Sequence, residues 1–423
     1  MNTFWKKFKI VLTDKKLRNK LLFVGFILVL FRMLAAIPIP GIDTSKLASF
    51  LANNQFFGIL NLFSGGGLSN LSIIMLGVGP FITGSIIMQL LTIMIPRLKA
   101  LYQEEGEAGR RKFTQYSRLL TVPLAVIQGL SLMVVLERQG VIQHLGMFAK
   151  VTNLSLVVAG SILLMWLGEL ISEYGIGNGV SMIIFAGIIS NIPRELSQLL
   201  FTYDQSQLPV YIGFAAVALL VIAAVVYITE AERPIPVTYA KQVRGNKMYG
   251  GTSTYIPLRI AQAGVIPIIF ALSILLFPQL IGNLMQSSAN GHLQSIGRTL
   301  ASFNQTSWLY GILYFFFVFI FTYFYTAVTF DPQSLSTNLQ KNGAFIPGIR
   351  PGEHTALYIS RVLNRITLIG GLFLGFIAVL PLIARGLTGI TSIALGGTAL
   401  LIVVSVVIDL IKKVEAQISM REY

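Results

Sequence analysis

Residues 56–91, FFGILNLFSGGGLSNLSIIMLGVGPFITGSIIMQLL, decide the fold. The second half of this stretch is long and apolar enough to begin a membrane-spanning helix. In the first half, Gly65, Gly66 and Gly67 stand in a row among serines and asparagines. Three consecutive glycines weaken a helix and leave backbone groups unpaired, which lipid cannot satisfy. We expect a short re-entrant piece that lies in a pore; an ordinary external loop is the alternative.

The composition is that of a polytopic integral membrane protein. Hydrophobic residues make up 54% of the 423 residues and charged residues only 12%, against about 25% charged residues in soluble domains. The length allows about ten spans of about 20 residues each. The absence of cysteine excludes disulfides, thiol catalysis and cysteine metal sites.

Ten apolar runs are candidate spans. They cover residues 21–37, 74–95, 119–136, 154–171, 180–200, 210–228, 260–276, 309–330, 366–383 and 391–408. The fifth run is the weakest, because Pro193, Arg194 and Glu195 interrupt it. We keep it, because ten spans place most of the 32 lysines and arginines in cytoplasmic connections, as the positive-inside rule requires.

The predicted fold is therefore an all-α polytopic membrane protein with both termini in the cytoplasm. Residues 1–20 alternate aromatic and basic residues and predict an amphipathic helix on the cytoplasmic membrane surface. Spans 1–5 form an N-terminal half over residues 21–200, and spans 6–10 form a C-terminal half over residues 201–411, followed by a tail at 412–423. Because each half has an odd number of spans, halves that arose by duplication would be inverted relative to each other.

Charged groups that could perform chemistry are scarce within the spans. Arg32, Glu169, Glu173 and Asp409 lie at span ends, where charged residues usually serve as interfacial anchors. The three histidines fall in loops and there is no phosphate-binding loop. We therefore expect no enzyme activity, no cofactor and no metal site. An inverted-repeat secondary transporter of a small solute is the main alternative to a channel, and an intramembrane enzyme is a third.

Branched apolar residues beside glycine or proline recur in several spans. They are Val78, Ile82, Ile184, Ile188, Ile269 and Ile402. Isoleucine in a span usually faces lipid or packs in a core. A ring of such residues at mid-membrane would instead form a hydrophobic constriction that blocks ions by dewetting.

Two long basic connections, residues 230–259 and 331–365, are predicted to lie in the cytoplasm. Their charge could simply set the topology, or it could dock a large acidic partner such as ribosomal RNA or a motor protein. Arg350 is the most suggestive residue, because the sequence PGIRPG at 347–352 predicts a rigid turn from which one arginine projects. GIGNG at 175–179 predicts a tight turn between spans 4 and 5.

At these motifs the chain resembles the SecY family of protein-conducting channels. The matching stretches run across nearly the whole chain: FRMLAAIPIPGID at 31–43, NLFSGGGLSNLSI at 61–73, GPFITGSIIMQLL at 79–91, EGEAGRRKFTQYSR at 105–118, WLGELISEYGIGNGVSMIIFAGI at 166–188, AGVIPIIFA at 263–271, GAFIPGIRPGEHTA at 343–356 and GGTALLIVV at 396–404.

The resemblance implies two clamshell-like halves around an hourglass pore that passes unfolded secretory polypeptides and releases transmembrane segments sideways into the cell membrane. It implies a plug at residues 57–72, with Phe57, Leu60, Phe63, Gly65, Gly66, Gly67, Leu68 and Leu71 as its key residues. It implies a pore ring at the six branched residues listed above, although Val78 replaces the isoleucine common in bacterial relatives.

The resemblance also implies partners. These are SecE-type and SecG-type small subunits, the SecA ATPase, the ribosome, signal-sequence-bearing preproteins and the lipid bilayer. Docking of SecA or the ribosome would use Lys241, Arg244, Lys247 and Arg350. A lateral gate would separate spans 2 and 3 from spans 7 and 8. An apolar ring with a plug fits a channel that must pass polar chains without leaking ions when idle.

Overall fold

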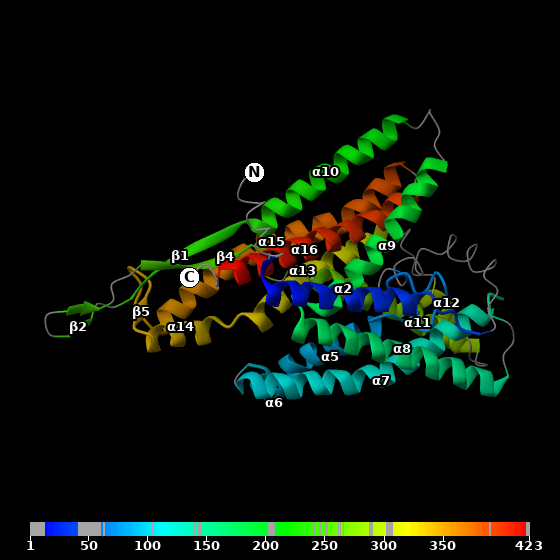
Figure 1. Ribbon diagram of the computed structural model, residues 1–423, viewed down its shortest axis with the longest axis horizontal. Coiled ribbons are helices and arrows are strands. Elements are labelled where there is room, and N and C mark those ends of the chain that lie inside the picture. Colours follow the sequence, from blue (N-terminus) through cyan, green and yellow to red (C-terminus); the bar gives the residue numbers. More distant parts are fainter. Residues whose placement is uncertain are drawn as a thin grey trace.

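The computed structural model is a bundle of long helices with a small β-structure at one end (Figure 1). It describes residues 13–40, 61, 64–103, 105–138, 140–142, 146–201, 208–239, 242–244, 247–249, 253–260, 262, 264, 266–286, 291–301, 308–388 and 391–419. The helical class predicted from the sequence is confirmed. The strands β1 to β5 were not predicted.

The first five predicted spans correspond to long helices, with boundaries that differ from the prediction. These helices are α2 (Lys15–Ala35), α5 (Gly79–Met94), α7 (Gly106–Arg138), α8 (Met147–Tyr174) and α9 (Gly179–Phe201). The weak fifth span is a continuous helix that contains Pro193. The predicted turn at residues 175–179 lies between α8 and α9, and Gly177 there has a φ of +100°.

A helix cap at Asp14 shows that the first spanning helix starts earlier than predicted. We expected one amphipathic helix up to residue 20, but α2 already begins at Lys15. The Asp14 carboxylate accepts hydrogen bonds from the backbone N–H groups of Lys16 and Leu17, so a new helix starts there. Residues 1–12 lie outside the described residues.

The second span begins later than predicted and ends in a sharp bend. Residues 74–78, expected to be part of the span, form turns, and α5 starts only at Gly79 with Pro80 in its first turn. At Ile95 the chain bends by 116° into the short helix α6 (Pro96–Gln103). The bend follows from Pro96, which disfavours a helical conformation at the preceding residue.

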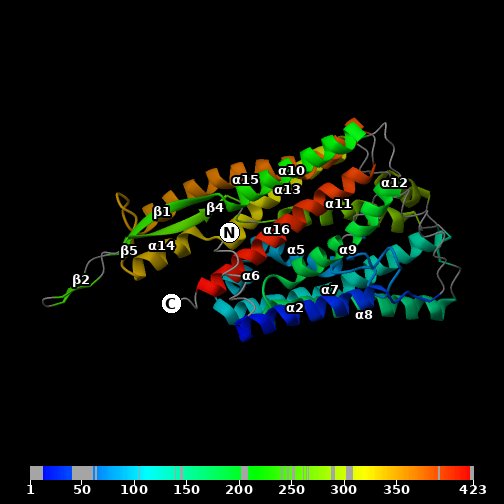
Figure 2. The ribbon, with the colours of Figure 1, turned by 45° about the horizontal axis from the view of Figure 1, so that its top comes forward.

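The second half contains the other five predicted spans as α10 (Leu208–Glu230), α11 (Ile266–Met285), α13 (Trp308–Thr329), α15 (Glu353–Thr388) and α16 (Thr391–Ser419). The short helix α12 (Gly291–Ala301) follows α11, at the end of the bundle opposite the strands (Figures 1 and 2). By length and composition alone, four of the described helices could cross a membrane, or five if the bent pair α5–α6 is one span.

The two long basic connections form structured elements. β1 (Glu232–Tyr239) pairs antiparallel with β4 (Ser253–Arg259), and β5 (Ala344–Phe345) joins the other edge of β1. β2 (Gln242–Arg244) and β3 (Lys247–Tyr249) form a hairpin beyond them. The helix α14 (Pro332–Lys341) lies beside this sheet, and both project from one end of the bundle (Figure 2).

Several helix ends meet at one face of the bundle. Leu17 near the start of α2, Ile176 between α8 and α9, and Ile418 near the end of α16 form one buried cluster. Lys412 of α16 also pairs with Glu230 at the end of α10, with 3.0 Å between Nζ and Oε1. The start of α2 and the ends of α8, α10 and α16 therefore lie at the same face, as ten alternating spans require.

Candidate pore, plug and docking surface

The glycine-rich segment is folded into the protein and is held by its own hydrogen bonds. Leu68 and Leu71 are fully buried. Ser64 Oγ accepts a hydrogen bond from the Leu68 N–H at 3.0 Å, and the Ser72 hydroxyl donates to the Gly67 carbonyl at 3.0 Å. These serines supply partners that a helix would otherwise provide. This finding favours the re-entrant interpretation over an external loop.

The end of the segment is tied to the chain that leaves α2. The Ile39 N–H donates to the Leu71 carbonyl at 2.9 Å, and the Ile73 N–H donates to the Ile37 carbonyl at 3.1 Å. These two bonds make an antiparallel bridge on either side of Pro38 and Ser72. The bridge fixes the base of the re-entrant segment.

A second attachment comes from α8. The Ser161 hydroxyl donates to the carbonyl of Gly77 at 2.8 Å, and both groups are buried. At Gly160 a Cβ would clash with the Ile73 carbonyl, so only glycine allows this close approach. The base of the segment thus contacts α8 backbone to backbone.

The tip of the described part of the segment, residues 64–67, lies between α2 and α9. Arg32, in the last turn of α2, donates from Nη1 to the Gly65 carbonyl at 2.8 Å. A Cβ at Gly65 would overlap the Phe31 ring, and a Cβ at Gly187 of α9 would overlap the Gly65 backbone. Gly65 has a φ of +64°, which favours glycine for a second reason.

The six predicted ring residues come from four parts of the chain and are all buried. Val78 caps α5, which carries Ile82; Ile184 and Ile188 lie on α9, Ile269 on α11 and Ile402 on α16. Their exposed fractions range from 0% for Val78 to 6% for Ile82 and Ile269. They belong to one buried apolar cluster, which also contains Leu68 and Leu71. Residues of the predicted ring and plug therefore share one buried apolar core.

The predicted turn around Arg350 is ordered by hydrogen bonds, and Arg350 itself is exposed. Its carbonyl accepts a bond from the Thr355 hydroxyl at 2.9 Å, and the Ser336 hydroxyl of α14 donates to the Gly352 carbonyl at 2.6 Å. Gly348 and Gly352 have φ values of +81° and +97°. The Ile349 N–H also donates to the Ile346 carbonyl at 3.1 Å, so hydrogen bonds fix the backbone on both sides of the exposed arginine.

Some predicted site residues lie outside what the structure describes. These are Phe57, Leu60 and Phe63 of the plug and Lys241 of the docking loop. Arg244 and Lys247 end β2 and begin β3 as opposed residues of the hairpin.

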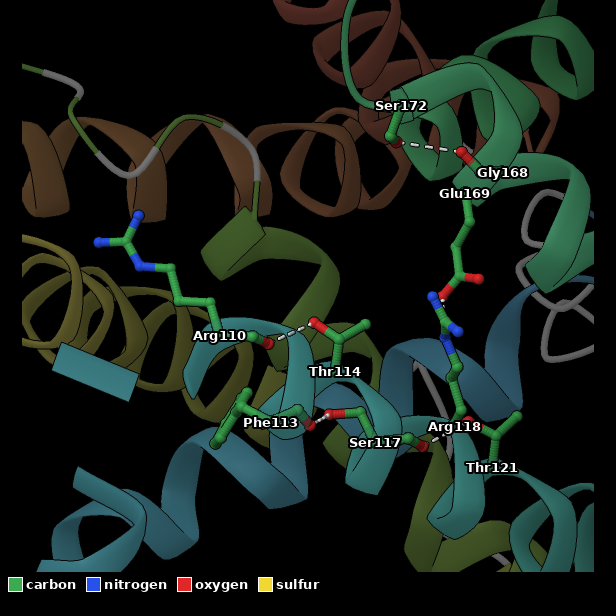
Figure 3. A network of polar contacts seen from close by, with 9 residues as sticks. All are labelled: Arg110, Phe113, Thr114, Ser117, Arg118, Thr121, Gly168, Glu169 and Ser172. Carbon is green, nitrogen blue, oxygen red and sulfur yellow. Dashed lines mark hydrogen bonds and ion pairs between the residues drawn. The ribbon is translucent and has the colours of Figure 1, made fainter. Parts of the chain in front are cut away.

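A polar network on the same face as the α8–α9 turn joins α7 to α8. Arg118 Nε lies 2.6 Å from Glu169 Oε1, and Ser172 donates to the Gly168 carbonyl at 3.0 Å (Figure 3). The Ser172 oxygen also accepts the Gly179 N–H at 2.9 Å, so it ties α8 to the start of α9. Glu169, expected to be an interfacial anchor, instead has a defined partner on the neighbouring helix.

The fold is similar to that of solved structures described as channels or channel subunits. One is described as a structure in which the plug domain of the SecY protein stabilises the closed state and maintains a membrane seal; it matches with a TM-score of 0.65 and 22% identity over 93% of this chain and 91% of that one. The channel in a canine ribosome–channel complex of the endoplasmic reticulum matches with a TM-score of 0.61 and 20% identity over the same shares. The fold is thus that of a ten-span channel with two inverted halves.

Sequence comparison gives the family. The SecY family model matches residues 72–411. The protein translocase subunit SecY of Streptomyces coelicolor is 43% identical over 424 residues, which cover 96% of each chain. The chain therefore belongs to the SecY family. It is a protein-conducting channel subunit of a translocon, a multi-pass protein of the bacterial cell membrane and not an enzyme.

Sequence reasoning missed the residues that seat the tip of the re-entrant segment. From the sequence, Arg32 is expected to be an interfacial anchor, and Gly187 is only one of the glycines beside branched apolar residues. An arginine in an otherwise apolar span was the available signal for Arg32. Nothing in the sequence pointed to Gly160 or Ser161, because small residues are common in membrane helices.

Proposed function

We propose that the buried ring of Val78, Ile82, Ile184, Ile188, Ile269 and Ile402 is the closed constriction of the channel, and that residues 57–72 are its plug. This proposal rests on one observation. The six ring residues belong to the same buried apolar cluster as Leu68 and Leu71. A constriction of branched apolar side chains excludes ions without binding any one substrate sequence. Displacement of the plug and widening of the ring would then open a path for a polypeptide.

We further propose that the exposed turn around Arg350 and the hairpin of β2 and β3 dock the SecA motor or the ribosome. The ordered backbone on both sides of Arg350 supports a docking role, because a fixed arginine loses little entropy on binding an acidic partner. The clustering of the start of α2 with the end of α16 supports placing both termini on this cytoplasmic face. SecE-type and SecG-type subunits would complete the channel.

The test is reconstitution of the chain with a SecE-type subunit and SecA in lipid vesicles, with ATP and a secretory precursor. The readout is precursor that becomes protected from external protease. We expect protection that requires both ATP and a signal sequence. If both partners bind and no precursor is protected, the assignment of the docking surface and of the pore is wrong for this chain.

A further inference from the structure

Two kinds of contact hold the re-entrant segment in place, one at its base and one at its tip. At its base, the bridge at Pro38 and Ser72 and the Ser161–Gly77 hydrogen bond hold backbone to neighbouring elements. Beside the base, Asn70 Nδ2 donates to the Ala35 carbonyl of α2 at 3.3 Å, and at the tip the long side chain of Arg32 donates to the Gly65 carbonyl at 2.8 Å. A movement of the tip away from α2 would break the Arg32 bond, whereas the bonds at the base involve residues 71–77 and not the tip.

Arg32 is well placed to hold the tip. It lies in the last turn of α2, where the unpaired helix carbonyls stabilise a positive charge. In the part of the chain that the structure describes, no carboxylate forms an ion pair with it. Among the described residues, its hydrogen bond goes to the Gly65 carbonyl of the plug backbone, and a charged donor makes a stronger bond to a carbonyl than a neutral one does.

The contact is made to backbone and not to a plug side chain. Gly65 is pressed against the Phe31 ring on one side and the Gly187 backbone on the other, so its carbonyl direction is fixed when the tip is seated. A shift of the tip by one bond length would break the Arg32 hydrogen bond and open both glycine contacts together. Because these contacts form and break together, the segment is expected to have two states, one seated and one displaced.

We infer that Arg32 is a latch that positions the plug in the closed channel, and that the bridge between residues 37–39 and 71–73 is the hinge about which the tip leaves. This inference rests on the proposed plug function. It adds that the closed state is selected by one guanidinium on the first spanning helix, and that the base of the plug stays attached when the channel opens.

The first test uses the reconstituted channel complex in a planar bilayer without precursor. Arg32→Gln should raise idle ion conductance roughly tenfold, as expected for loss of a hydrogen bond from a charged donor, while precursor transport persists. Arg32→Lys should restore part of the seal. Met33→Ala is the matched control, since the adjacent Met33 side chain is 66% exposed, and should leave conductance unchanged.

A variant that lacks residues 57–70 tests the plug proposal separately from the latch proposal. If the deletion raises conductance and Arg32→Gln does not, the plug proposal stands and the latch is wrong. If the deletion itself leaves conductance unchanged, the proposed plug function fails and the latch fails with it.

A second readout does not depend on conductance. The chain has no cysteine, so Leu68→Cys introduces a unique thiol at a fully buried plug position. A water-soluble thiol reagent should label it roughly tenfold faster when Arg32→Gln is added. Ser295→Cys, on the exposed surface of α12, should label at the same rate in both backgrounds. Equal labelling of Leu68→Cys in both backgrounds would overturn the latch.

Discussion

Where the re-entrant segment meets its neighbours, glycines determine how closely the backbones approach each other. Gly187 admits the backbone of Gly65, and Gly160 admits the carbonyl of Ile73. Backbone at this distance leaves no room for even one methyl group, and packed interiors relax only partly around added volume. If the segment is the proposed plug, the seal of the closed channel depends on single glycines far apart in the sequence.

Gly187→Ala tests this dependence. The new Cβ would overlap Gly65, and relief requires the plug tip to move away from α9. An overpacking cost of about 1–3 kcal/mol should raise idle ion conductance roughly tenfold or more. Gly213→Ala on α10 is the control, because a Cβ there meets no described atom within 4 Å. Conductance that is unchanged in both variants would contradict the close contact.

Arg350 gives a residue-scale prediction about docking. Arg350→Glu reverses an exposed charge on a turn whose backbone bonds do not involve the side chain. We expect ATP-driven precursor transport to fall at least roughly tenfold, because a like-charge contact replaces an attractive one, while the protein folds normally. Lys341→Glu, also exposed near the same turn, is the control. Equal loss in both variants would indicate general charge sensitivity instead of a docking role for Arg350.

At the scale of elements, the two basic connections form one small domain-like unit with its own core. Ile235 and Val237 of β1, Leu258 of β4 and Ala344 of β5 form a buried cluster with Ile359 of α15. Ile235 and Val237 of β1 face this core, and Pro236 between them is exposed, as the alternation of a strand requires. The turn around Arg350 is therefore attached to a sheet that is anchored on a spanning helix.

Val237→Asp should open this sheet without unfolding the bundle. Val237 is 1% exposed, and burial of a carboxylate there should cost about 3 kcal/mol or more. We expect faster cleavage of residues 232–259 in limited proteolysis and weaker motor coupling, with the spans still protected. Tyr255→Asp is the control, since Tyr255 is 65% exposed on the paired strand. A protease-resistant Val237→Asp variant would show that the cluster does not hold the sheet.

At the scale of the whole molecule, the first half meets the second partly through α11. Both α5 and α7 pack against α11, while α13 packs closely on α15 within the second half. Gly371 and Gly375 of α15 receive the rings of Phe319 and Phe315 of α13, which joins these two helices tightly. The packing between the two halves at α11 is thus looser than the packing of α13 on α15. A lateral gate would open between the halves.

A pair of introduced cysteines tests this arrangement, because the chain has none of its own. A disulfide between facing positions of α7 and α11 should block release of a transmembrane segment into lipid, and reduction should restore it. A disulfide between α13 and α15 should leave release unaffected, since these helices stay together. Normal release with α7 and α11 bridged would exclude this seam as the exit path. The readout is extraction of the inserted segment by alkaline buffer.

The sequence predicted the helical class, the ten apolar segments and the fixed turn around Arg350. It failed at helix starts and at the strands. Ile74 to Val78 are as apolar as any span, yet they form turns. The Met75 N–H donates to the Ser72 carbonyl, the Gly77 N–H donates to the Ile74 carbonyl, and Gly77 has a φ of +60°, which an α-helix does not allow. The strand pairing of β1 with β5 joins residues more than a hundred positions apart, and no local pattern encodes it.

What the sequence by itself determined is what depends on local composition: apolar length, the placement of charge, and glycines that cannot form a helix in lipid. The tertiary structure alone decided which groups satisfy the broken segment. Arg32, Gly187 and Ser161 come from three different helices, and each meets the segment only after those helices have packed. Lipid leaves every backbone group of a re-entrant chain to be paired by protein, so the partners are chosen by packing and not by neighbours in the sequence.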